Sequence, residues 1–162
     1  PGEAHLAGVR GGDSLNHDMA AECVSFFRLF ADACHHGKEE DLLFPSLVES
    51  GLPSDGGPIA VMIYEHGLGR AFVARMGASL EAARTGDPAA NAELMEAAEG
   101  FIELIVAHIG KEDNVLFNMA DNLIVGPECK DLCANYDAVC ARTFEGQTKQ
   151  DLEALGSRIL AR

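Results

Sequence analysis

The chain has 162 residues, and its 26 acidic and 12 basic side chains give a net charge of −14. This length predicts a single domain, and 48% hydrophobic with 23% charged residues excludes a chain that is disordered throughout. Because so acidic a protein repels phosphate backbones and anionic lipids, we expect neither nucleic acid nor a membrane surface as a partner.

No apolar run approaches the roughly 18 residues that a membrane-spanning helix needs. The N-terminus shows neither the basic nor the apolar region of a signal peptide. The five cysteines are an odd number and form no CxxC pair, which argues against a disulfide scaffold. These features together predict a reducing compartment, the cytoplasm.

Glycine and proline divide the chain into four helical stretches. Asp13, Ser14 and Asn16 are candidate N-cap residues for the first stretch. Gly51 and Pro53 supply the turn chemistry that ends it. The first stretch is expected to end near residue 50. The other three are expected to span 58–84, 88–122 and 128–162, the last with a break near 145–146.

Stretches with the alternating pattern of β-strands are absent from the sequence. The fold class is therefore expected to be all-α, an antiparallel bundle with short connections. We expect one domain over 1–162, with a bundle core at about 14–125 and a C-terminal helical extension at 127–162. The apolar period of the third helix predicts an inward stripe of Phe101, Leu104, Ile105, His108, Glu112, Val115 and Met119.

Two segments of the chain repeat each other almost letter for letter. HHGKEEDLLF stands at His35–Phe44 and HIGKEDNVLF at His108–Phe117. Both match the pattern H-x-G-K-E-[ED]-x-[LV]-L-F, and they fall on different expected helices. Such self-similarity predicts two equivalent halves of one site.

The spacing within each repeat is typical of a metal site. Residues four apart on a helix lie one above the other, so His35 and Glu39 share one face, as do His108 and Glu112. Two such helices face to face can enclose a pair of metal ions that the carboxylates bridge and the imidazoles cap. Nitrogen and oxygen ligands without thiolate favour iron, manganese or zinc. An ionised Glu112 on an apolar face is costly unless it is paired or metal-bound.

The first repeat has a second possible register, because His36 and Glu40 are also four residues apart. Alignment of the two repeats favours His35 and Glu39 and places His36 about 100° further round the helix. Three alternatives are open for His36: a further ligand at the rim, a hydrogen-bond donor behind the ligands, or a surface residue.

The second expected helix carries the motif EHGLGR at residues 65–70. With two half-sites already present, His66 is the natural completing ligand. Arg70 lies one turn further on and is expected to pair with a bridging carboxylate or with a bound anionic oxygen species. Glu65, like Arg70, is expected beside the ligands without binding metal itself.

These motifs resemble the hemerythrin-like (HHE cation-binding) family, whose bacterial members show HHGKEEDLLFP, EHxxGR and HIxKEDxxLF in this order. The resemblance covers roughly residues 20–125. It implies an antiparallel four-helix bundle around a non-haem di-iron centre, with an oxo or hydroxo bridge, histidine caps and two bridging carboxylates. The ligands that it implies are His35, Glu39, His66, His108 and Glu112, with His36 at the place of a further ligand in an iron-sensing relative.

The chain departs from the family pattern at two places. Oxygen-carrying hemerythrins have a second histidine where Arg70 stands, which argues against pure oxygen storage. The family's first helix also brings a histidine that would precede Pro1. His17 is about 27 Å along the helix from His35, and His5 reaches the site only if residues 1–13 fold back. Either a first helix precedes this sequence, or the C-terminal helix forms the fourth side of the bundle.

The C-terminal stretch places Cys129, Cys133 and Cys140 on one helix face. We expect these thiols, like Cys23 and Cys34, to be small buried hydrophobic side chains rather than redox or metal groups.

The leading hypothesis is a small di-iron protein that binds or senses dioxygen or nitric oxide. One alternative is a di-iron enzyme or repair protein that turns over peroxide or nitric oxide or donates iron. The presence of Arg70 in place of a histidine ligand suggests this alternative. The other is a metal-stabilised regulatory module. No catalytic residue is assigned, and the sequence leaves the metal, the physiological ligand and the oligomeric state open.

Overall fold

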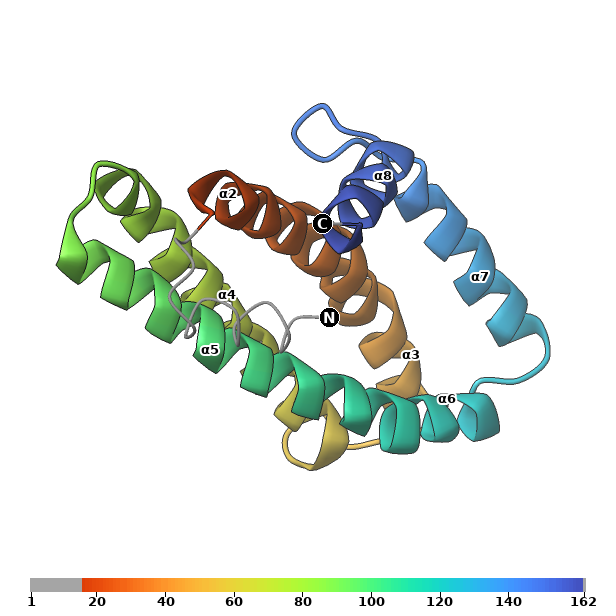
Figure 1. Ribbon diagram of the computed structural model, residues 1–162. Coiled ribbons are helices and arrows are strands. Elements are labelled where there is room, and N and C mark those ends of the chain that lie inside the picture. The colour runs from red at the N-terminus through yellow and green to blue at the C-terminus, as the bar shows by residue number, and fades with distance from the viewer. Residues whose placement is uncertain (1–15, 162) are drawn as a thin grey trace.

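The computed structural model describes residues 16–161, which form helices joined by turns and loops and contain no strand (Figure 1). The elements are α2 (His17–Phe26), η1 (Phe27–His36), η2 (Glu39–Leu43), α3 (Phe44–Glu49), α4 (Gly57–Arg84), α5 (Pro88–Lys111), η3 (Glu112–Leu116), α6 (Phe117–Leu123), α7 (Pro127–Cys140) and α8 (Lys149–Leu160). The prediction of an all-α antiparallel bundle with a C-terminal helical segment is confirmed. The expectations for His5, Asp13 and Ser14 lie outside the described residues.

Side-chain caps set where α2, α5 and α8 begin. The Asn16 side chain accepts a hydrogen bond from the backbone N–H of Met19 at the start of α2. Asp87 caps α5 in the same way, and Thr148 forms a capping box with Asp151 at the start of α8. Each of these side chains satisfies backbone N–H groups that have no partner inside the helix. The starts of these three helices are therefore determined by residues close in the sequence.

Two of the three long helices contain wide π-helical turns. The first long helix, residues 17–49, contains η1 and η2, and the third long helix, residues 88–123, contains η3. The expectation that Val115 points inward is wrong, since Val115 is 43% exposed and Leu116 is fully buried. A π turn takes about one residue more than an α turn, so η3 carries the buried face one position further along the chain.

Two apolar clusters fill the bundle, one towards each end. One is formed by Met76, Ala83, Leu94, Ala97 and Phe101, and the other by Leu43, Phe44, Leu47, Ile59, Met62, Leu116 and Ile124. Along each of the three long helices, the residues between the two clusters include buried histidine or glutamate. The polar site therefore lies between two apolar layers.

The two C-terminal helices, α7 and α8, pack against the first long helix. The helices α4 and α5 form a hairpin, and α2 packs on α4. The helix α8 packs against α2 and η1, and α7 packs against η2 (Figure 1). Leu132 and Tyr136 attach α7 to the second apolar cluster. No described helix combines the length and the apolar character needed to span a membrane.

The expectation that the cysteines of α7 are buried is wrong for Cys129 and Cys133, which are exposed. The buried side of α7 is the stripe of Leu132, Tyr136 and Val139. At 100° per residue, the cysteine stripe lies roughly 60–90° away from that side. Cys34 is buried as expected, with 1% exposure.

The approach of α4 to α5 requires glycine at residue 100. A Cβ atom there would lie 2.5 Å from the Phe72 ring. The guanidinium of Arg75, three residues further along α4, lies over this ring. At Gly77 of α4, a Cβ would make only an ordinary 3.6 Å contact with Val24.

We expect Gly77→Ala to raise the free energy of unfolding by about 0.5–1 kcal/mol, because alanine favours the helix. The free energy of unfolding of Gly100→Ala should be at least about 1 kcal/mol lower than that of Gly77→Ala, because overpacking against the Phe72 ring cancels the gain in helix propensity. Urea unfolding of the two variants measures the difference, and equal stabilities would show that the Phe72 ring yields freely.

Candidate metal centre

The middle of the bundle contains five buried polar side chains, which we call the inner cluster. Their exposed fractions lie between 1% and 6%. His36 and Glu39 come from the first long helix, His66 from α4, and His108 and Glu112 from the third long helix. The twin repeats and the second-helix motif, far apart in the sequence, therefore meet in one place.

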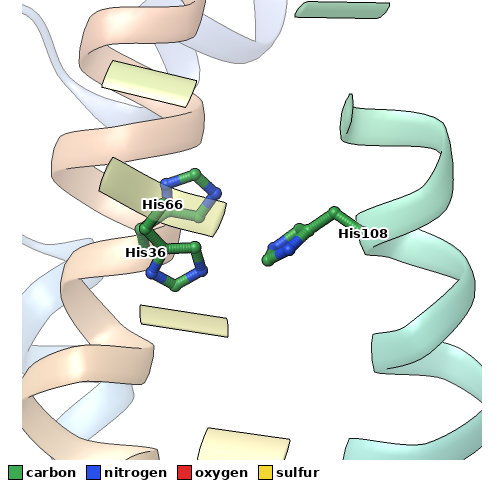
Figure 2. A group of neighbouring side chains, drawn as sticks. All are labelled: His36, His66 and His108. Atoms are coloured by element: carbon green, nitrogen blue, oxygen red, sulfur yellow. The ribbon is translucent and has the colours of Figure 1, made fainter. Parts of the chain in front are cut away.

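The inner cluster is compact. Ligand atoms of Glu39, His66, His108 and Glu112 all lie within 4.8 Å of one another, as do those of the three histidines. Figure 2 shows His108 facing the His36–His66 pair from the opposite side. The rings of His36 and His66 are stacked, with centroids 3.9 Å apart. Both carboxylates thus lie within reach of the same imidazoles.

Most of the atoms that face the inside of the cluster have no hydrogen-bond partner. These atoms are both carboxylate oxygens of Glu39, Oε1 of Glu112, and the Nε2 atoms of His66 and His108. Nε2 of His108 lies 2.9 Å from Oε1 of Glu112, but not in hydrogen-bond geometry. Unpaired buried polar atoms are costly, and charged ones more so. Two carboxylates and several imidazoles aimed at one point are a donor set that fits metal cations.

His35 lies at the edge of this cluster rather than inside it. Its side chain is 42% exposed, and its Nε2 lies 3.8 Å from Oε1 of Glu112 and 3.9 Å from Oε2 of Glu39. The Glu112 carboxylate raises the pKa of His35 against the opposing effect of burial. His36, by contrast, is 6% exposed, so the surface alternative for this residue is excluded.

The rings of the buried histidines contact three further carboxylates, which we call the outer carboxylates: Asp32, Glu40 and Glu65. Nδ1 of His66 lies 2.7 Å from Oε1 of Glu40, in a hydrogen bond. Nδ1 of His108 lies 2.9 Å from Oε2 of Glu65. Asp32 approaches Nδ1 of His36 to 3.4 Å. A carboxylate on Nδ1 holds the proton there and leaves Nε2 as a lone pair, which is how metal-binding histidines are oriented.

Two cations hold the outer carboxylates in place. Arg70 donates from Nε to Asp32 at 2.8 Å and from Nη2 to Glu40 at 2.9 Å. Lys111 donates to Oε1 of Glu65 at 2.6 Å. Burial raises the pKa of Asp32 and of Glu65, but these cations and the histidines lower both below the ordinary value. Asp32 and Glu65 therefore stay ionised.

The structure places Glu65 and Arg70 beside the inner cluster, where Arg70 contacts the outer carboxylates instead of Glu39 or Glu112. Asp32 and Glu40 were not among the expected site residues. Asp32 had a signal in the sequence, its spacing of four residues from His36. Glu40 contacts His66 and Arg70 of another helix, which no local spacing reports. Nε2 of His17 donates to Oδ1 of Asn91 at 3.0 Å, near the starts of α2 and α5.

Comparisons with known proteins agree with the sequence motifs. Residues 3–120 match the family described as hemerythrin HHE cation binding domain. Uncharacterized proteins from Mycobacterium bovis and from two strains of Mycobacterium tuberculosis are each 26% identical over 123 residues, which is 76% of this chain and 48% of theirs. The chain thus spans about half the length of these curated relatives. No solved structure matches it at a significant level.

Proposed function

Because this chain belongs to the hemerythrin HHE cation-binding family, we propose that its inner cluster holds two non-haem iron ions and binds dioxygen or nitric oxide as a small ligand. The observation that carries the proposal is the set of buried, unpartnered ligand atoms that converge within 4.8 Å. Glu39 and Glu112 would bridge the ions, and the imidazoles of His35, His36, His66 and His108 would cap them.

Iron in such a site supplies redox electrons and an open coordination position for a diatomic ligand. The chain supplies the orientation of its ligands. Glu40 and Glu65 hold protons at Nδ1 of His66 and His108, so that both Nε2 atoms face inward. The Phe44 ring lies against the His66 ring, with centroids 5.8 Å apart, and restricts the imidazole. The ligand set is therefore preorganised before any ion binds.

The surroundings of the cluster support binding more than turnover. Apolar layers lie at both ends of it and exclude water. Arg70, the motive for the enzyme alternative, donates to Asp32 and Glu40 and not into the cluster. The partly exposed His35 marks the side from which a small ligand would enter.

Elemental analysis of the chain, purified without added metal, tests the proposal together with ligand addition. We expect two irons per chain, and a new near-ultraviolet or visible absorption when the anaerobically reduced protein meets dioxygen or nitric oxide. Iron below one equivalent, or no spectral change with either gas, would contradict it. Steady consumption of peroxide or nitric oxide well above the rate of free iron would favour the enzyme alternative instead.

The outer carboxylates give a further prediction. Glu65→Ala removes the acceptor on Nδ1 of His108, and we expect iron affinity to fall by about 10–100-fold. Competition with a chelator measures this. Glu103→Ala, an exposed glutamate on the same helix as His108, is the control and should leave the affinity unchanged. An unaltered affinity in Glu65→Ala would mean that the ring of His108 is held by packing alone.

A further inference from the structure

The exposed face of α7 carries two cysteines that the inner cluster does not use. Cys129 and Cys133 are both exposed and stand four residues apart in the same helix. Residues at this spacing are neighbours on a helix surface. Desolvation by the surrounding chain and the neighbouring Cys129 thiol raise the pKa of Cys133.

The helix holds these two side chains too far apart for a direct bond between the sulfurs. Cβ atoms at positions i and i+4 of a helix are about 5–6 Å apart. A disulfide needs Cβ atoms about 3.5–4.5 Å apart. Oxidation to a Cys129–Cys133 disulfide would therefore distort the first turns of α7.

An ion between the two sulfurs suits the same spacing. Thiolate–metal bonds are about 2.3 Å long, so two sulfurs on one ion lie up to about 4.6 Å apart. That separation is within reach of side chains whose Cβ atoms are one helical turn apart. The pair is thus shaped to chelate a thiophilic cation without unwinding the helix.

The number of ligands selects the kind of cation. Structural zinc requires four ligands. Cys140, the next thiol of α7, lies about 10 Å further along the helix from Cys133 and accepts a hydrogen bond from Lys38 at 3.9 Å. Among residues 16–161, no thiol belongs to a group of three or more potential metal ligands. Soft thiolates in a pair suit copper(I), which accepts two ligands.

We propose that Cys129 and Cys133 form a second metal site, a dithiolate that binds one monovalent soft cation of the copper(I) type. Each thiol loses its proton to solvent and forms one sulfur–metal bond, so the cation keeps its oxidation state and two protons are released. The neighbouring acidic residues Glu128, Asp131 and Asp137 and the net charge of −14 attract the cation to this helix.

Anaerobic titration of the reduced full chain with copper(I), against a coloured copper(I) chelator, tests this site. We expect one tightly bound copper per chain, with X-ray absorption showing two sulfur neighbours. Cys129→Ser and Cys133→Ser should each weaken binding by at least about 100-fold, since the second thiolate of a chelate acts at a high effective concentration.

Cys140→Ser is the matched control, because it removes a thiol from the same helix and should leave binding unchanged. Tight copper with only nitrogen or oxygen neighbours would overturn the proposal, as would copper retained in Cys133→Ser. One copper per two chains, with a copper-dependent dimer, would also overturn it, because the ion would then bridge two molecules. The sulfur neighbours distinguish this site from the inner cluster, whose imidazoles and carboxylates offer copper only nitrogen and oxygen.

Discussion

The double variant Glu39→Gln, Glu112→Gln is expected to lose iron and yet to be more stable than the metal-free parent. Both carboxylates are 3% exposed, and most of their oxygens have no partner. The two carboxylates lie close together in a buried site, where they repel each other and have lost their hydration. Burial opposes the ionisation of Glu112, but His108 and His35 lower its pKa and so compensate its charge, whereas both oxygens of Glu39 are left without a hydrogen bond. Metal binding offsets that cost in the parent, whereas a neutral amide avoids it.

Iron analysis and urea unfolding together check this prediction. Iron affinity should fall by at least about 100-fold, since even residues behind metal ligands contribute 10–100-fold. The free energy of unfolding of the metal-free variant should exceed that of the metal-free parent. The control is Glu49→Gln, Glu81→Gln, which removes two exposed charges and should change neither quantity. A metal-free double variant that is less stable than the metal-free parent would mean that the carboxylates stabilise the fold without a cation.

Removal of metal from the parent is expected to lower its melting temperature by roughly 8–16 °C. A ligand present at 1,000 times its dissociation constant stabilises the folded state by about 4 kcal/mol. For a chain of this size, each kcal/mol corresponds to about 2–4 °C. The metal-free protein is also less stable because the unpartnered polar atoms of Glu39, His66 and His108 remain buried in it.

Calorimetry before and after chelation measures this shift. Iron added back should restore the higher melting temperature, which separates metal loss from damage by the chelator. The Glu39→Gln, Glu112→Gln variant should melt at the same temperature with and without chelator. A parent that also melts at one temperature would indicate that no ion occupies the inner cluster.

The helices and their limits could be predicted from the sequence because their signals are local. Asn16 caps α2, Pro58 and Pro88 fall in the first turns of α4 and α5, and glycine or proline separates each pair of long helices. The repeat likewise indicated the residue types of the site, since an imidazole and a carboxylate four residues apart share a helix face. The roles of these residues as metal ligands, and the single domain over 1–162, stay predictions.

Only the tertiary structure decided which side chains turn inward. The alignment of the repeats favoured His35, and the helical period of 3.6 favoured Val115. The π turns of η1 and η3 instead accompany a buried His36 and a buried Leu116. A wide turn persists only where packing and buried polar groups from other helices favour it, and no local pattern reports those neighbours. The contacts of Arg70 with Asp32 and Glu40 likewise connect α4 to the first long helix, and no local sequence pattern predicts them. The sequence by itself determined the helices and the chemistry that they carry; their register depended on contacts between segments far apart in the chain.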